Sequence, residues 1–137
     1  MACVFCDDSQ SAGELVVAFD DWSLLLHPDS AVRGHAMLVA KRHIENFADL
    51  TGDEAQEFAR VARVCERALL DVTRTDRAIL MKLGIATPHL HIHIYPVSRA
   101  LDREAVQRII DAKVREDREP GFAGTLRDRI RALDIAD

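Results

Sequence analysis

Short apolar segments bounded by turn residues dominate the first third of the chain and recur later. Segments of this length and character are typical of β-strands. The third of them follows a His-Pro-Asp-Ser turn and Gly34. We expect strands over residues 14–20, 22–27, 36–41, 77–83 and 89–97. The first three follow one another closely, which favours an antiparallel meander.

A long amphipathic helix is predicted after the third strand. Thr51 and Glu54 have the spacing of a capping box, in which each side chain accepts a hydrogen bond from the other residue's backbone N–H. Beyond them apolar residues recur every three or four positions, which predicts a helix from about 52 to 72 with one stripe facing the core. The stripe consists of Ala55, Phe58, Val61, Ala62, Cys65, Ala68, Leu69 and Val72.

Shorter helices are expected toward the C-terminus. An amphipathic helix is marked by Val106, Ile109, Ile110 and Val114. The segment Thr-Leu-Arg-Asp at 125–128 has the spacing of a cap for a short third helix. These elements predict an α+β fold, a strongly twisted antiparallel sheet with one long and one or two shorter helices. Residues 98–137 form a helical extension in this scheme.

Length, composition and charge limit the possible functions. A chain of 137 residues is expected to form one domain, residues 1–137. No apolar run approaches the roughly 18 to 20 residues of a membrane span. The acidic start MACVFCDDSQ lacks the features of a secretion signal, so a cytoplasmic location is expected. A formal net charge of −5 without a clustered basic patch argues against nucleic-acid binding.

Three of the six histidines alternate with aliphatic residues in the last predicted strand, at His89, His91 and His93. Alternate side chains of a strand lie on one face, about 6.6 Å apart, so three imidazoles share a face while the aliphatic residues face the core. A neutral imidazole that is held through one nitrogen can use the other as a nucleophile, which is the favoured interpretation. An incidental polar face and a structural metal strand are the alternatives.

The motifs around these histidines resemble those of the histidine triad (HIT) family. The segment from His89 has the signature His-x-His-x-His-x-x with apolar x, and the segment from Arg33 to His43 is similar to the family's Gly-His-x-Leu-Val-x-Pro-Lys-x-His segment. The resemblance covers roughly residues 3–97. It implies a HIT-like fold and an enzyme that acts on a small-molecule nucleotide.

The resemblance also implies a mechanism. His91 would attack the α-phosphorus of a nucleoside phosphate, His93 would support the phosphate, and water would hydrolyse the nucleotidyl-histidine intermediate. Such a covalent nucleophile needs no metal for the chemistry itself. Leaving groups in the family include amines, nucleotides and sugars, so the implied activity is that of a phosphoramidase or dinucleoside polyphosphate hydrolase. A homodimer through edge strands and the long helix is implied as well.

Several positions depart from the family pattern. Ala86 stands where many members carry a Ser or Thr that contacts the phosphate or leaving group, and Thr87 is the nearest hydroxyl. His27 stands where the family uses an acidic or amide residue on the ribose, so its ring is a candidate to bind the sugar. Leu26 is a candidate to hold the base, with plain core packing as the alternative. At His35, in the family's Gly-His position, a contact to local backbone is expected rather than a catalytic role.

Cys3 and Cys6 form a Cys-x-x-Cys pair, a spacing that lets two thiolates reach one tetrahedral Zn²⁺ from a tight turn. A redox pair and two unrelated thiols are the alternatives. A subset of the family begins with Cys-x-Phe-Cys, and the resemblance implies that His43 and His89 complete the site. This zinc would be structural, because four protein ligands close its coordination sphere.

Two other classes of function remain open at this point. A zinc-stabilised nucleotide-binding or interaction protein with little turnover would explain Ala86 and His27. A metal-storage module would need ligands beyond the two cysteines and two histidines of the predicted zinc site. The middle histidine, His91, is the feature that favours the enzyme.

Overall fold

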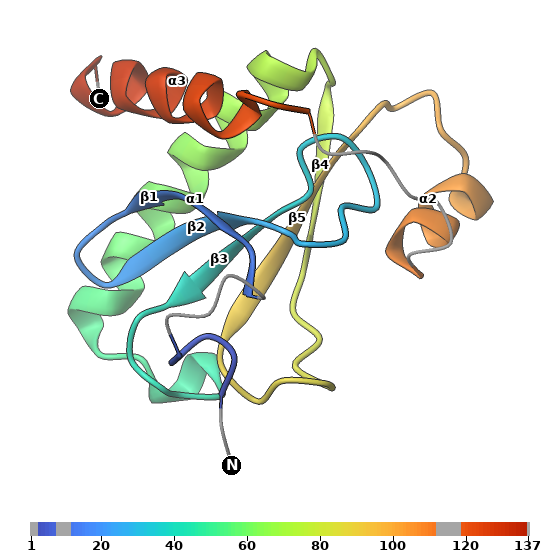
Figure 1. Ribbon diagram of the computed structural model, residues 1–137. Helices are drawn as coiled ribbons and strands as arrows, with labels where there is room; N and C mark the ends of the chain where they lie inside the picture. Colours follow the sequence, from blue (N-terminus) through green and yellow to red (C-terminus); the bar gives the residue numbers. More distant parts are fainter. Residues whose placement is uncertain (1–2, 8–11, 112–118, 137) are drawn as a thin grey trace.

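Five antiparallel strands form one twisted sheet in the order β1-β2-β3-β5-β4 (Figure 1). The computed structural model describes residues 3–7, 12–111 and 119–136. The strands are β1 (Glu14–Ala18), β2 (Trp22–Leu26), β3 (Ala36–Ala40), β4 (Arg77–Met81) and β5 (His91–Val97). The helices are α1 (Gly52–Thr73), α2 (Arg103–Ile110) and α3 (Phe122–Ala136), with a 3-10 turn, η2, at Phe47–Asp49. The α+β prediction is confirmed.

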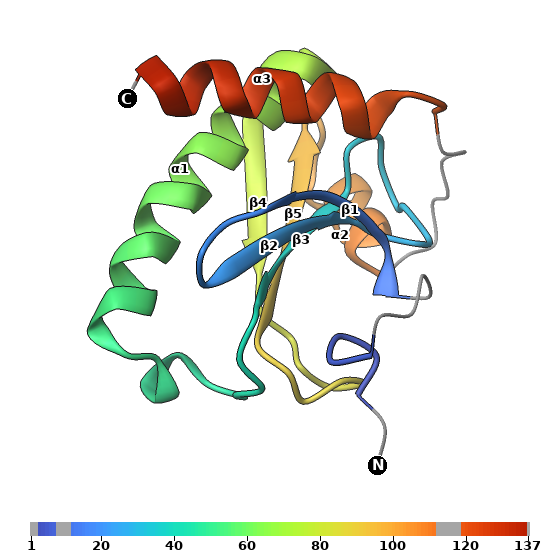
Figure 2. The same ribbon diagram turned by 60° about the vertical axis from the view of Figure 1, so that its left-hand side comes forward.

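The two faces of the sheet carry separate hydrophobic clusters. On one face, aliphatic residues of β2, β3 and β5 such as Leu38 and Ile94 pack with α1 and α3 into the main core. On the other, Tyr95 and Val97 of β5 pack with Ile109 of α2. Figure 2 shows α1 along one side of the sheet and the N-terminal turn on the other. The histidine face of β5 is therefore the face that α1 does not cover.

Helix α1 begins as its capping box predicts. The Thr51 hydroxyl accepts a hydrogen bond from the Glu54 N–H at 3.1 Å, and a Glu54 carboxylate oxygen accepts from the Thr51 N–H at 2.8 Å. The buried Glu54 side chain also accepts from Arg42, at 2.9 and 3.2 Å. These contacts fasten the segment after β3, which carries His43, to the start of α1.

Substituting Glu54 by Gln is expected to lower the melting temperature at neutral pH. The difference in melting temperature between the variant and the wild type should become smaller in acid. The hydrogen bond from Arg42 lowers the pKa of Glu54 to about 2. A carboxyl group whose pKa is lower in the folded than in the unfolded state contributes stability above its unfolded pKa, about 4.3, and loses that contribution as the pH falls through the folded value. Thermal unfolding of both proteins between pH 7 and pH 2.5 measures this.

The control is Asp53→Asn, which removes an exposed acid from the same helical turn. Its effect on the melting temperature should be small at every pH. If the melting temperatures of Glu54→Gln and the wild type differ by the same amount at pH 7 and at pH 2.5, the role given to the Arg42 contact is contradicted.

The C-terminal half departs from the expected elements in two ways. Helix α3 begins at Phe122 and runs for 15 residues, so Thr125 lies inside it and the prediction of a short helix capped at Thr125 was wrong. The last strand begins at His91, two residues later than expected. Helix α2 ends at Ile110, and Val114 lies outside the described residues. Within the described residues, no helix is long and apolar enough to cross a membrane.

Candidate functional site

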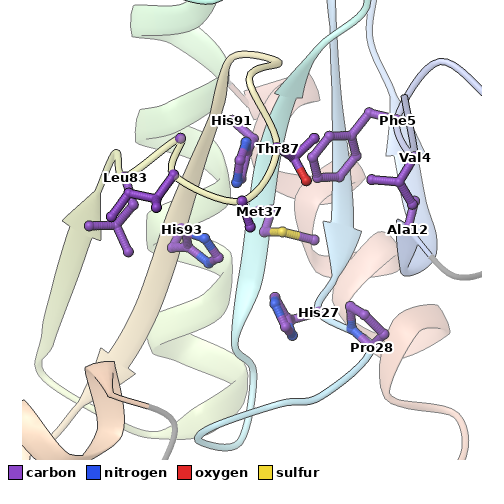
Figure 3. Close-up of a pocket in the computed structure, with 13 residues that line it drawn as sticks. Val4, Phe5, Ala12, His27, Pro28, Met37, Leu83, Thr87, His91 and His93 are labelled. Carbon is purple, nitrogen blue, oxygen red and sulfur yellow. The ribbon is translucent and has the colours of Figure 1, made fainter. Parts of the chain in front are cut away.

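A cavity of about 360 Å³ opens on the histidine face of the sheet. His91 and His93 of β5 lie across from Val39 and Met37 of β3 in the antiparallel register, and Met37 also lines the cavity. In Figure 3 the two histidines lie between Leu83 on one side and Phe5 of the N-terminal turn on the other. The N-terminal turn and the segment before β5 are far apart in the sequence, and both lie beside β5 at this cavity.

The His91 ring is held through a single nitrogen. Its Nδ1 lies 2.6 Å from the backbone carbonyl oxygen of His89, so Nδ1–H donates to that carbonyl. In the neutral ring the Nε2 atom then carries a lone pair. The side chain is buried but lines the cavity. This arrangement is the one that a nucleophilic imidazole requires.

A chain of hydrogen bonds determines which nitrogen of His93 carries the proton. The Ala31 N–H donates to Nδ1 of His35 at 3.2 Å, so the neutral His35 ring is protonated at Nε2. That Nε2–H donates to Nδ1 of His93 at 3.0 Å, which leaves the proton of neutral His93 on its own Nε2. His93 is therefore a hydrogen-bond donor through Nε2 at the cavity. The expected contact of His35 to local backbone is present.

Burial keeps both of these rings neutral near pH 7. It lowers the pKa of His35 to about 2 and the pKa of His93 to about 4, with neighbouring imidazoles adding to both shifts. His35 is sandwiched between two rings, His27 at 4.3 Å and Tyr95 at 4.3 Å between centroids. Burial and the neighbouring imidazoles both disfavour a protonated ring in this stack, so the tautomers above are those that apply at neutral pH.

The three predicted nucleotide contacts have different surroundings. His27 and Thr87 both line the cavity. The Nδ1 atom of His27 accepts a hydrogen bond from the Asp29 N–H at 3.0 Å, which places the proton of the neutral ring on Nε2. Leu26 lies in the main core and not among the residues that line the cavity, so the structure does not support it as a base contact.

Apolar residues that were not anticipated line much of the cavity. Phe5 lies between the two cysteines of the N-terminal turn, and its ring centroid is 4.8 Å from that of His91 and 5.5 Å from that of His89. Val4, Ala12 and Met37 also line it. The position of Phe5 inside Cys-x-x-Cys is the sequence signal that could have identified it. If the two cysteines lie beside β5, the residues between them lie there as well.

Cys3, Cys6, His43 and His89 come together at the N-terminal end of β5 and could hold a metal ion. Nδ1 of His89 lies 3.4 Å from Sγ of Cys3, and Nδ1 of His43 lies 3.1 Å from Sγ of Cys6. The two Nδ1 atoms are 3.2 Å apart. Tetrahedral zinc with Zn–N near 2.0–2.1 Å and Zn–S near 2.3 Å places ligand atoms about 3.3 to 3.8 Å apart. The separations of 3.1 to 3.4 Å lie within this range or just below it, so the group fits zinc.

Three further hydrogen bonds support this cluster as a metal site. The turn is closed by backbone N–H groups of Cys6 and Asp7, which donate to the Cys3 carbonyl at 3.1 and 3.0 Å. The Nε2–H of His89 donates to the Ala40 carbonyl at 2.6 Å, which leaves the Nδ1 lone pair for a metal. A backbone carbonyl is one of the usual partners of the second nitrogen of a metal-ligating histidine.

His27, His35 and His93 form a second group with ligand atoms close together. Hydrogen bonding makes it unsuited to a metal. The Nδ1 lone pairs of His35 and His93 already accept hydrogen bonds, and a proton lies between these two rings. A metal there would have to displace that proton and break the contact from Ala31. The group is better described as a hydrogen-bonded chain.

Gly34 lies just before β3, and its backbone conformation helps to determine the position of His35. Its torsion angle φ is +85°, and a Cβ atom there would lie 2.8 Å from Cγ2 of Thr73 and 3.2 Å from Cγ of Pro96. We expect Gly34→Ala to lower the free energy of unfolding by roughly 1 to 3 kcal/mol. Gly124→Ala, in α3 with nothing within 4 Å, should instead raise it by up to about 1 kcal/mol. Chemical denaturation measures both, and equal effects would contradict the steric argument.

Comparisons with known proteins identify the family of the chain. The sequence model of the HIT domain matches residues 8–100, more than half of the chain. Adenosine 5'-monophosphoramidase HINT3 of Xenopus tropicalis is 29% identical over 103 residues, covering 69% of this chain and 67% of that protein.

Solved structures share the fold. A Zn-bound histidine triad family protein from Mycobacterium smegmatis superposes with a TM-score of 0.73 at 22% identity, covering 99% of this chain and 98% of the other. A hypothetical histidine triad nucleotide-binding protein from Sulfolobus tokodaii superposes with a TM-score of 0.70 at 20% identity. This match covers 96% of this chain and 94% of the other. With the family model, the histidine strand and its cavity in agreement, the chain belongs to the HIT domain family.

Proposed function

We propose that the protein is a nucleotide-binding hydrolase or transferase that cleaves a bond at the α-phosphorus of a nucleoside phosphate through a nucleotidyl-histidine intermediate at His91. The observation that carries the proposal is the hydrogen bond from Nδ1–H of His91 to the His89 carbonyl, beside a cavity that can hold a ligand. It orients the ring and leaves Nε2 as the nucleophile. The similarity to a phosphoramidase supports the reaction class.

The reaction has two steps. First, the Nε2 lone pair of His91 bonds to phosphorus while the bond to the leaving group breaks, and that electron pair stays with the leaving group. An amine takes up one proton from water as it leaves, whereas a carboxylate or phosphate needs none. Second, a water oxygen bonds to phosphorus, the P–N electron pair returns to Nε2, and the water releases a proton. An alcohol in place of water gives transfer.

Other residues of the cavity bind and orient the substrate in this scheme. The Nε2–H of His93 donates to a phosphate oxygen, and the tautomer that makes this possible is maintained by His35. His27 contacts the ribose and Thr87 the phosphate or leaving group, since both line the cavity. Ala86 beside Thr87 supplies no hydroxyl.

Zinc held by Cys3, Cys6, His43 and His89 would supply a structural cross-link and not a reacting group. The ligand distances and the His89 contact to Ala40 support this assignment. His89 provides the carbonyl that holds His91, so a fixed His89 also fixes the nucleophile. The proposal needs no metal in the reaction itself.

A nucleotide-binding protein with little turnover is the second candidate. The absence of a hydroxyl at Ala86 and the imidazole at His27 favour it. We also propose a single domain over residues 1–137. A homodimer is proposed as well, because β4 is an edge strand with a partly exposed Leu80. The cytoplasmic location stays a prediction.

Turnover assays distinguish the two candidates. The purified protein is incubated with adenosine and guanosine 5'-phosphoramidates and with dinucleoside polyphosphates, and release of the nucleoside monophosphate is followed by chromatography. Multiple turnovers would support the enzyme. Tight binding of nucleotides with no release from any of these substrates would favour the binding protein.

A further inference from the structure

Three rings lie in one row across the sheet, on its histidine face. The His27 N–H donates to the His35 carbonyl at 2.9 Å, which places these two residues side by side next to the end of β2 and the start of β3. In the register of β3 and β5, Ala36 pairs with Ile94, so His35 lies across from Tyr95, one position further. Side chains at opposite positions of a sheet are close neighbours. The row therefore carries His27, His35 and Tyr95 in this order.

The rings of this row are stacked on one another. The centroids of His27 and His35 are 4.3 Å apart and their planes are within 9° of parallel. The centroids of His35 and Tyr95 are also 4.3 Å apart, with 26° between the planes. Rotation of the His35 ring out of its plane would bring it against one of these neighbours. The stack thus fixes the plane of His35, while its hydrogen bonds decide which edge of the ring faces His93.

Tyr95 is the fixed neighbour in this stack. It is 3% exposed and belongs to the hydrophobic cluster that contains Ile109 of α2. His27 lies on the cavity side instead, where a substrate reaches it. Neither Tyr95 nor His35 is among the residues that line the cavity. An effect of Tyr95 on a bound substrate therefore passes through His35 and His93.

The plane of His35 matters because its Nε2–H supplies the hydrogen bond that leaves His93 protonated at Nε2. The two nitrogens are 3.0 Å apart, and such a bond weakens steeply when the N–H points away from its acceptor. An aliphatic side chain at position 95 has no flat face and would let the His35 ring tilt. A favourable aromatic pair shifts an equilibrium by roughly two- to tenfold beyond the effect of its buried area.

We propose that Tyr95 is a positioning residue for the reaction, because its ring holds His35 in the plane from which the Nε2–H of His35 reaches His93. This inference rests on the proposed function, in which His93 donates to a phosphate oxygen. Tyr95 itself touches neither the substrate nor the reacting atoms. Its hydroxyl has no part in this role, so phenylalanine is expected to serve at position 95 and an aliphatic residue is not.

Nuclear magnetic resonance of isotope-labelled protein tests the structural part without substrate. Wild type and Tyr95→Phe should show a scalar coupling between Nε2 of His35 and Nδ1 of His93 across their hydrogen bond. In Tyr95→Leu, exchange of the His35 Nε2–H with water should be at least about tenfold faster than in the wild type. The matched control is Val97→Ala, which removes packing from the same cluster but no ring from the stack. Equal exchange rates in wild type and Tyr95→Leu, or the same acceleration in Val97→Ala, would overturn the inference.

Turnover of a nucleoside phosphoramidate tests the functional part. Tyr95→Leu should lower kcat by roughly five- to tenfold with little change in KM, because His93 donates less often as charge develops on the phosphate. Tyr95→Phe should keep the wild-type kcat, and so should Val97→Ala even if it melts at a lower temperature. A kcat for Tyr95→Leu within about twofold of wild type, or an equal loss in Val97→Ala, would overturn the inference.

The two measurements separate this inference from the proposed function. Wild-type protein that turns over no substrate would overturn the proposed function, while the exchange rate of the His35 proton still decides whether Tyr95 holds that ring. If Tyr95→Leu does not fold, Tyr95→Met takes its place, because an unbranched thioether fills irregular space in a core without offering a flat face. The same results then support or overturn the role of Tyr95.

Discussion

Replacing His91 by alanine is expected to lower kcat by on the order of 10³-fold or more, with a smaller change in the affinity for substrate. The substitution removes the Nε2 lone pair that bonds to phosphorus, and no covalent intermediate can then form. Neighbouring rings do not replace it, because Nδ1 of His93 already accepts a hydrogen bond from His35 and its Nε2 carries a proton. Release of the nucleoside monophosphate under saturating substrate measures the effect.

Control variants separate loss of chemistry from loss of structure. His91→Ala should retain the proposed zinc ion and unfold cooperatively, since the ring lines the cavity and lies outside the main core. His27→Asn, on the same cavity, should change KM more than kcat because it is assigned to the ribose. Turnover by His91→Ala within tenfold of wild type would contradict the proposed nucleophile.

Replacing Cys6 by serine is expected to abolish binding of the proposed zinc ion and to lower the melting temperature by roughly 10 °C or more. A ligand present at a thousand times its dissociation constant stabilises the folded state by about 4 kcal/mol, and 1 kcal/mol corresponds to a few degrees in a chain of this size. The loss would also release Phe5 from its place beside His91. Elemental analysis and thermal unfolding, with one zinc ion per chain expected in the wild type, measure both effects.

Cys65→Ala is the matched control for this experiment. Cys65 is fully buried in the main core, where burial raises the pKa of its thiol to about 12, so it is not available as a metal ligand. The variant should keep one metal ion per chain even if it is less stable. Retention of the metal by Cys6→Ser, or its loss from Cys65→Ala, would contradict the assigned ligands.

The elements with strong local signals were predictable from the sequence. The capping box of Thr51 and Glu54 and the apolar stripe after it place α1 within one residue of its observed end at Thr73. The alternation at His91 and His93 places both rings on one face of β5 because strand geometry leaves no other arrangement. By contrast, α3 starts at Phe122 without the cap expected at Thr125, since burial of Phe122 and Leu126 against the core determines where that helix lies.

The site was less predictable because its parts come from distant segments. Periodicity and spacing alone do not indicate that His43 and His89 meet Cys3 and Cys6, and only the family resemblance implied it. The direction of the hydrogen bonds from Ala31 through His35 to His93 depends on a turn whose geometry the sequence does not encode in a simple motif. Leu26 was predicted to line the site but does not. Its side chain lies in the main core, while that of its neighbour His27 lines the cavity.

The central claim is a covalent nucleotidyl group on His91, and rapid quenching followed by intact-mass analysis and peptide mapping tests it most directly. Wild-type protein is mixed with excess nucleoside phosphoramidate, quenched at alkaline pH during the first turnover, and digested. We predict a mass increase of one nucleotidyl group on the peptide that contains His91, formed at least as fast as kcat. Product formation with no adduct at any time, or an adduct on another residue, would contradict the account.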